Sequence, residues 1–162
     1  MFERDLAEGQ APMCDKTLIY CDIDGVLHRW PCPSAQMFDP ACMARLESVI
    51  RPHNAGLVIT STWRLELPLK KLQRMLGPLG ACLRGVTPEI DDPFLKFRRY
   101  HEVLEYQEQH APAASRWIAI DDEPGRYPGN INNLILTDPR VGFSEKDALR
   151  LSNWLGHKSA AY

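Results

Sequence analysis

The stretch Leu18–Leu27, LIYCDIDGVL, decides the fold, because an apolar strand in it runs directly into two carboxylates. Side chains alternate along a strand, so Asp24 is expected to return to the side of Asp22, and Gly25 permits a sharp turn after them. Two carboxylates so placed repel each other, and a bound divalent cation removes that repulsion. The stretch therefore predicts a metal site at a strand end. The alternative is a solvated acidic turn in which Asp22 caps a helix.

Short apolar runs alternate with helical patterns along the rest of the chain. The runs are almost continuously hydrophobic, which suits strands covered on both faces, as in a parallel sheet. The predicted strands are Thr17–Cys21, Leu57–Thr60, Cys82–Val86, Trp117–Ile120 and Leu134–Leu136. The predicted helices are 41–50, 67–76, 98–110 and a last one that follows Ser144 and extends to Leu155.

Two of these helices carry recognisable start signals. Asp39 followed by Pro40 is typical of an N-cap and first helical position, and Ser144 with Asp147 resembles a capping box. The βαβα rhythm predicts an α/β fold, a doubly wound and mostly parallel sheet flanked by helices. In such folds ligands bind outside the carboxyl ends of the strands.

Length and composition indicate one soluble domain. The chain has 162 residues, of which 44% are hydrophobic and 25% charged, as in ordinary globular proteins. We expect a loose N-terminal arm over 1–16, a single domain over 17–158 and a C-terminal tail over 159–162. The formal net charge of −2 excludes a global positive field that would hold nucleic acid, so any such contact must be local.

The sequence also bears on the compartment. The five cysteines form no CxxC pair and no zinc-site spacing with histidine, which indicates reduced thiols. Met1–Lys16 has no apolar core, and no run elsewhere approaches membrane-spanning length. We therefore expect a cytoplasmic protein without a membrane partner.

Four segments, in order, resemble the motifs of the haloacid dehalogenase-like (HAD) phosphohydrolases. Asp22–Leu27 resembles the first motif, in which the first aspartate is the nucleophile and the second the general acid/base. Leu57–Thr60 is similar to the second, an apolar strand ending in Thr or Ser, and Ile118–Asp122 resembles the acidic fourth. A Lys or Arg within 96–99 would serve as the third. The resemblance implies a Rossmann-like HAD core.

A narrower resemblance is carried by two short segments. STWR at 61–64 and DDE at 121–123 resemble the small HAD domains of RNA-repair "Swiss Army knife" proteins. A carboxylate can attack phosphorus only if its repulsion from the phosphate is cancelled, which explains the need for Mg²⁺. The resemblance thus implies a magnesium-dependent phosphatase that forms a phosphoryl-aspartate on Asp22.

The resemblance also assigns roles to the site residues. By this resemblance, the expected catalytic residues are Asp22, Asp24 and Lys96. The expected substrate-binding residues are Thr60, Ser61, Arg64 and Arg99, and the expected metal ligands are Asp22, Asp24, Asp121 and Asp122. Several choices stay open. Thr60 is favoured over Ser61 because it ends the apolar run, Lys96 competes with Arg98 and Arg99, and either acid of the late pair can ligate the metal directly.

The spacing between motifs limits the substrate. Neither the interval between Leu27 and Leu57 nor that between Arg64 and Lys96 can hold a large cap domain. By resemblance, an open site favours a substrate that brings its own cover, such as a nucleic-acid end or a phosphoprotein, although a small phosphate ester fits as well. Two rivals are a phosphoacceptor receiver domain, whose motif order differs, and a catalytically silent phosphate- or RNA-binding module.

Overall fold

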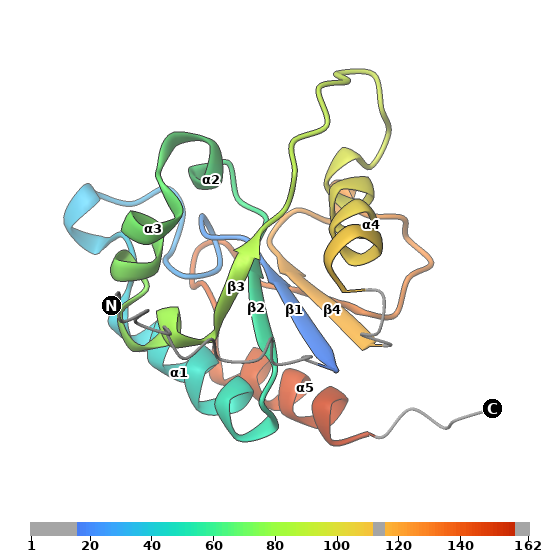
Figure 1. Ribbon diagram of the computed structural model, residues 1–162. Coiled ribbons are helices and arrows are strands. Elements are labelled where there is room, and N and C mark those ends of the chain that lie inside the picture. The colour runs from blue at the N-terminus through green and yellow to red at the C-terminus, as the bar shows by residue number, and fades with distance from the viewer. Residues whose placement is uncertain (1–15, 112–115, 158–162) are drawn as a thin grey trace, which may run out of the picture.

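The computed structural model describes residues 16–111 and 116–157, and its centre is a sheet of five parallel strands (Figure 1). The order across the sheet is β3-β2-β1-β4-β5. The strands are β1 (Thr17–Cys21), β2 (Gly56–Ile59), β3 (Leu83–Val86), β4 (Arg116–Asp121) and β5 (Leu134–Leu136). Because β1 is central and the chain leaves it in both directions, the predicted doubly wound α/β fold is confirmed.

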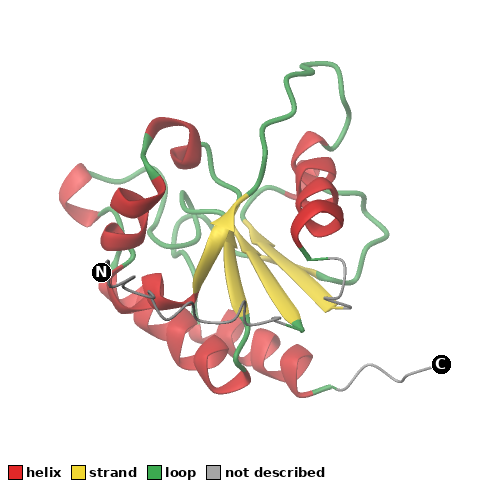
Figure 2. Cartoon of the chain, in the orientation of Figure 1, coloured by secondary structure: helices red, strands yellow, loops and turns green. Residues whose placement is uncertain are grey.

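Helices cover both faces of the sheet (Figure 2). They are α1 (Pro40–Ile50), α2 (Trp63–Glu66), α3 (Leu69–Met75), α4 (Arg98–His110) and α5 (Glu145–Gly156). Four 3₁₀ segments, Ser34–Gln36, Arg51–His53, Gly77–Cys82 and Pro124–Arg126, lie in the connections. The larger core lies under α1 and α5, and the smaller core lies under α4.

The alternation of side chains along the strands divides the two cores. In β1, Ile19 and Cys21 belong to the larger core, whereas Leu18 and Tyr20 belong to the smaller core beneath α4. The same alternation runs through β2 and β4. Position in a strand therefore decides which helix layer a side chain meets.

The predicted elements are confirmed with small shifts at their ends. Asp39 caps α1 by accepting a hydrogen bond from Ala41 N, and Ser144 with Asp147 forms the expected capping box of α5. The helix predicted over 67–76 is shorter: Leu67 is extended (φ −119°, ψ 138°), and α3 begins only after Pro68. A residue before proline is pushed out of the helical region. The short α2 was not predicted.

The connections are as short as the spacing indicated. Between β1 and β2 the chain forms α1 and two 3₁₀ turns, and between β2 and β3 it forms α2, α3 and one 3₁₀ segment. Within 16–111 and 116–157, no connection adds a second sheet or a cap. None of the helices in these ranges is long and apolar enough to cross a bilayer. The arm and tail expected at the two ends fall outside the described residues, except for Lys16.

Candidate active site

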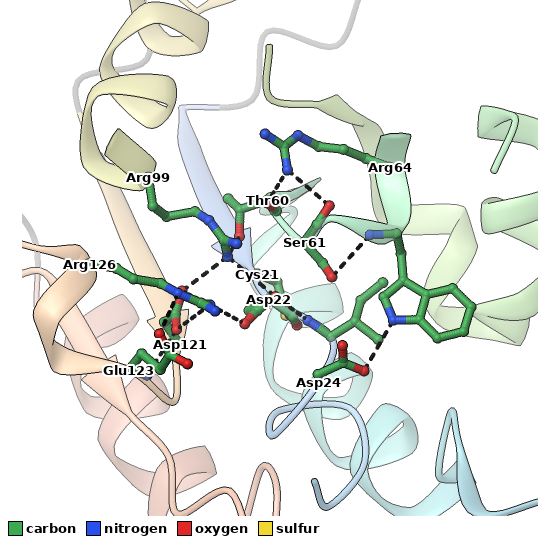
Figure 3. Close-up of polar contacts among 12 residues, drawn as sticks. Cys21, Asp22, Asp24, Thr60, Ser61, Arg64, Arg99, Asp121, Glu123 and Arg126 are labelled. Atoms are coloured by element: carbon green, nitrogen blue, oxygen red, sulfur yellow. Dashed lines mark hydrogen bonds and ion pairs between the residues drawn. The ribbon is translucent and has the colours of Figure 1, made fainter. Parts of the chain in front are cut away.

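Three polar side chains lie at one level across the carboxyl edge of the sheet. Cys21 pairs with Ile59 on one side and Ile120 on the other, so the next residues, Asp22, Thr60 and Asp121, are neighbours on three adjacent strands. These three residues are at most 3% exposed. Side chains alternate between the two faces of a strand, and each of the three lies two residues after one that faces α4, so all three are on that face. The sheet thus buries two carboxylates and a hydroxyl together (Figure 3).

The first turn of α4 supplies a cation to this layer. Arg99 Nη1 lies 3.2 Å from Thr60 Oγ1, 3.2 Å from Asp121 Oδ2 and 3.3 Å from Asp22 Oδ1. Phe97 precedes the helix in the left-handed region (φ 56°), a conformation that costs roughly 1–3 kcal/mol for such a residue. This turn lets the helix begin at Arg98 and places Arg99 over the carboxylates.

The structure does not bring the predicted Lys96 into the layer. Lys96 is exposed, and its Nζ lies 4.8 Å from the centroid of the Phe97 ring. Of the cations that the sequence left open for the third motif, Arg99 is the one that contacts both carboxylates. The parity of Asp22, Thr60 and Asp121 explains this, because their side chains face the helix layer that carries Arg99.

Arg126 is a second cation at the site and was not predicted. Its Nη1 lies 2.7 Å from Asp22 Oδ2 and 3.1 Å from Asp121 Oδ1, and its Nε lies 2.9 Å from Glu123 Oε2. The turn over Pro124–Arg126 folds the chain back so that Arg126 returns to the strand end that it has just left (Figure 3). The signal that could have found it is the PG pair directly before an arginine.

Asp24 is held by two donors on its own side of the site. His28 Nδ1 accepts a hydrogen bond from Phe38 N at 3.0 Å. Since a backbone N–H can only donate, His28 must carry its proton on Nε2, which donates to Asp24 Oδ1 at 2.8 Å. Trp63 Nε1 donates to the same oxygen at 3.1 Å. His28 is fully buried and in contact with Asp24, so it fixes the orientation of this carboxylate.

Arg64 is bound to the protein itself. Its guanidinium donates to the carbonyls of Thr60, Ser61, Thr87 and Pro88 and pairs with Glu102 at 3.0 Å. These contacts hold the ends of β2 and β3 to α4. The neighbouring Ser61 is 1% exposed, and its hydroxyl lies 3.4 Å from Trp63 N. Of the two candidate hydroxyls, Thr60 is therefore the one in contact with Arg99.

The carboxylates fit a magnesium ion. Asp22, Asp121 and Asp122 each offer one oxygen, and these atoms lie within 4.8 Å of one another. Carboxylate oxygens are the ligands that Mg²⁺ prefers. Gly25 leaves room for this set: its φ is 76°, and a Cβ built there overlaps the Asp122 carboxylate. Asp24, also predicted as a ligand, is not among the three.

The pKa values of Asp121 and Asp122 are both raised above the ordinary value for an aspartate. Burial, reinforced by the charge of Asp22, raises the pKa of Asp121 to about 7, although Arg99 and Arg126 act in the opposite direction. Burial and Asp22 also raise the pKa of Asp122. Burial alone would lower the pKa of Arg126, but the negative charges of Asp121, Asp22 and Glu123 have a larger effect and raise it. The two arginines thus do not outweigh the combined effect of burial and of repulsion among the acids.

The first prediction concerns the pH dependence of stability. Because the pKa of Asp121 is higher in the folded protein, the unfolded chain releases this proton first as pH rises from about 4 to about 7. Folding stability in EDTA should therefore fall across that window. In Asp121→Asn the midpoint of thermal unfolding should change less between pH 5 and pH 8 than in the wild type.

Glu108→Gln, at an exposed position of α4, is the matched control and should keep the wild-type difference. Equal pH dependence in Asp121→Asn and the wild type would contradict the assignment. Saturating Mg²⁺ should raise the midpoint more at pH 8 than at pH 5, because ionised carboxylates bind the metal.

The second prediction concerns competition between Arg126 and the metal. Arg126 donates to oxygens of Asp22 and Asp121 that a cation would also use. Removing its charge in Arg126→Gln should strengthen Mg²⁺ binding without phosphate by about threefold or more, since nearby like charges repel. Calorimetric titration measures this. Arg140→Gln, which loses a pair with Asp138 instead, should bind Mg²⁺ like the wild type; unchanged or weaker binding by Arg126→Gln would refute the competition.

Comparison with known proteins agrees with this geometry. A family model described as "HAD domain in Swiss Army Knife RNA repair proteins" matches residues 18–148, which is most of the chain. Neither the search of curated proteins nor that of solved structures found a match. The match contains the ends of β1, β2 and β4 that build the site, and the order of the strands is that of a Rossmann-like HAD core. The chain therefore belongs to the HAD domain family of Swiss Army Knife RNA repair proteins.

Proposed function

We propose that the protein is a magnesium-dependent phosphomonoester hydrolase in which Asp22 is the nucleophile. The observation that carries this proposal is the buried layer in which Asp22, Thr60 and Asp121 share one cation, Arg99. A buried carboxylate with cations on both of its oxygens is suited to approach an anionic phosphate. Membership of the HAD family supports a phosphohydrolase-type role.

The first step transfers the phosphoryl group to the protein. A carboxylate oxygen of Asp22 forms a bond to phosphorus while the bond from phosphorus to the ester oxygen breaks. Asp24, in its protonated form, gives its proton to the departing oxygen. His28 and Trp63 both donate to Oδ1 of Asp24, so the proton is carried on Oδ2. Arg99 and Arg126 balance the charge on the phosphate oxygens.

The second step returns the protein to its starting state. Asp24, now a carboxylate, takes a proton from water as the water oxygen attacks phosphorus and the bond to Asp22 breaks. The side chain of Asp24 is 28% exposed, so water can reach it. When bound at Asp22, Asp121 and Asp122, Mg²⁺ supplies positive charge that reduces the repulsion between carboxylate and phosphate.

One observation favours a second candidate, a silent phosphate- or RNA-binding module. Arg99 and Arg126 both contact Asp22, so one of its oxygens is paired with each arginine. In a silent module these pairs would persist and the arginines would bind phosphate without turnover. The complete set of Asp22, Asp24 and the metal-binding acids supports the enzyme instead.

The third prediction separates these two functions. Asp22→Asn is nearly isosteric but cannot attack phosphorus, so turnover of a phosphate ester with Mg²⁺ should fall by roughly 10³-fold or more. Release of inorganic phosphate measures it, and circular dichroism checks the fold. Asp138→Asn, which alters an exposed acid paired with Arg140, should keep wild-type turnover. Turnover within threefold of the wild type in folded Asp22→Asn would refute the nucleophile, and no turnover by the wild type on any ester would favour the silent module.

For the substrate we propose a nucleic-acid end or another macromolecular phosphate. Within the ranges that the structure describes, the connections between the strands add no cap, so the substrate itself must exclude water from the site. Lys96 and Arg98 are exposed beside Arg99 and can hold a phosphate backbone despite the net charge of −2. The matched family consists of domains in RNA repair proteins. The alternative is a small-metabolite phosphatase.

The fourth prediction compares the two substrate classes. The kcat/KM of a terminally phosphorylated oligonucleotide should exceed that of an aryl phosphate, and the advantage should shrink as salt is raised from 50 to about 200 mM, because phosphate contacts release counterions. A panel of 3′- and 5′-phosphorylated oligonucleotides, sugar phosphates and nucleotides tests it. Rates that do not depend on oligonucleotide length, together with a much better metabolite, would overturn the macromolecular substrate.

We also propose a reducing compartment, the cytoplasm. Cys21 and Cys42 are buried thiols outside any disulfide. Burial raises the pKa of both, so they remain protonated and unreactive. Such thiols suit a compartment in which disulfides do not form.

A further inference from the structure

A cavity of about 300 Å³ lies next to the carboxylate layer. Its walls come from α2, the loop after β3, the first turn of α4 and the turn after β4. Arg99 and Arg126 belong to its lining, and each of these arginines also forms ion pairs with both Asp22 and Asp121. The cavity and the proposed phosphate site therefore share a wall. A group attached to a phosphate at that wall would extend into the cavity.

The charged residues of the lining differ in whether they are already paired within the protein. Arg64 and Glu102 are buried and paired with each other at 3.0 Å, so they form a neutral wall. Arg98 and Glu89 are exposed and can contact a ligand. The polar contacts of Arg99 with Thr60, Asp22 and Asp121 run through Nη1. The cavity thus offers donors for phosphate and one carboxylate that accepts hydrogen bonds.

The remaining lining is apolar and open. The Phe97 ring is half-buried, and Leu65 of α2 is 49% exposed although it lies at the cavity. At Gly125, a Cβ built on the backbone meets no atom within 4 Å. The cavity combines an aromatic ring and an aliphatic side chain with cations, which is the pattern that binds a nucleobase together with its phosphate.

We propose that this cavity binds the nucleoside of a nucleoside monophosphate unit, whose phosphate lies at Arg99 and Arg126. This inference rests on the proposed function and adds a site for the group that carries the phosphate. The volume suits one nucleoside rather than several, at the lower end of ligand pockets. A bare sugar phosphate lacks the base that would contact the apolar walls at Phe97 and Leu65. The unit can come from a strand end or from a free nucleotide.

Binding to an inactive protein tests the cavity independently of turnover. The full chain carrying Asp22→Asn is titrated with adenosine 5′- and 3′-monophosphate, ribose 5-phosphate and inorganic phosphate in the presence of Mg²⁺. The better adenosine phosphate should bind at least tenfold more tightly than ribose 5-phosphate, because stacking of the base adds affinity. Equal affinities of ribose 5-phosphate and both adenosine phosphates would overturn the proposal.

Two glycines provide a matched pair of variants. Gly125 lines the cavity and Gly129 does not; each has open space at its Cβ position, and neither has a positive φ. In the Asp22→Asn background, Gly125→Leu should fill the cavity and reduce the advantage of the adenosine phosphate to below twofold. Gly129→Leu should preserve it. An unchanged advantage in Gly125→Leu would contradict the assignment.

A second pair tests a different element of the lining, α2, so that a shift of Arg126 by the new leucine cannot explain the result. Leu65 and Leu69 are 49% and 48% exposed, but only Leu65 lines the cavity. Leu65→Ala should weaken binding of the adenosine phosphate about threefold or more with little change for inorganic phosphate. Leu69→Ala should change neither, and equal effects of the two substitutions would refute a specific contact.

An oligonucleotide with a terminal phosphate distinguishes the two sources. If strand ends are bound, the oligonucleotide should bind at least as tightly as the mononucleotide and lose affinity in Gly125→Leu. Tenfold weaker binding of the oligonucleotide would overturn the strand end as the source and identify the free nucleotide. Binding as expected without turnover by the wild type would refute the proposed hydrolase while supporting the cavity, so the two failures remain distinguishable.

Discussion

The parallel register of β2, β1 and β4 is the constraint on which the site depends. It places the residues after Ile59, Cys21 and Ile120 at one level, and strand alternation turns Thr60, Asp22 and Asp121 toward the same helix. Two carboxylates are thereby buried side by side at the sheet edge. A fold that concentrates negative charge in this way must also supply cations, because unpaired buried charges are costly. Arg99, Arg126 and a metal ion are three cations that can supply this positive charge.

Arg99 and Arg126 differ in how firmly they are held at the carboxylates. Arg99 is 9% exposed, enters from α4 and bridges the hydroxyl and both carboxylates, so it belongs to the framework of the site. Arg126 comes from a short turn, its side chain is 29% exposed, and it uses oxygens that a metal ion would use. A cation of this second kind can change partners when metal and phosphate arrive. The raised pKa of Asp121 indicates that the arginines alone do not satisfy the cluster.

The sequence predicted those features that depend on interactions between residues close together in the chain. Strand lengths, the helix over Arg98–His110, the caps at Asp39 and Ser144, and the placement of Asp22 at a strand end follow from periodicity and capping chemistry. Thr60, favoured over Ser61 in the sequence because it ends the apolar run, also has the strand parity of the residues that face α4.

Other features needed three-dimensional information. Lys96 and Arg99 differ by less than one helical turn, and only the left-handed Phe97 decides which of them faces the carboxylates. Arg126 enters through a turn whose direction is not encoded in any periodic pattern. The central claim is that this layer is a magnesium and phosphoryl site, and a crystal structure with Mg²⁺ and beryllium fluoride, a phosphoryl mimic, tests it most directly. The account predicts the metal on Asp22, Asp121 and Asp122, the fluoride group on an Asp22 oxygen, and Arg126 released from Asp22. A structure in which both ligands are absent from this layer at saturating concentrations, with Arg126 still bonded to Asp22, would contradict it.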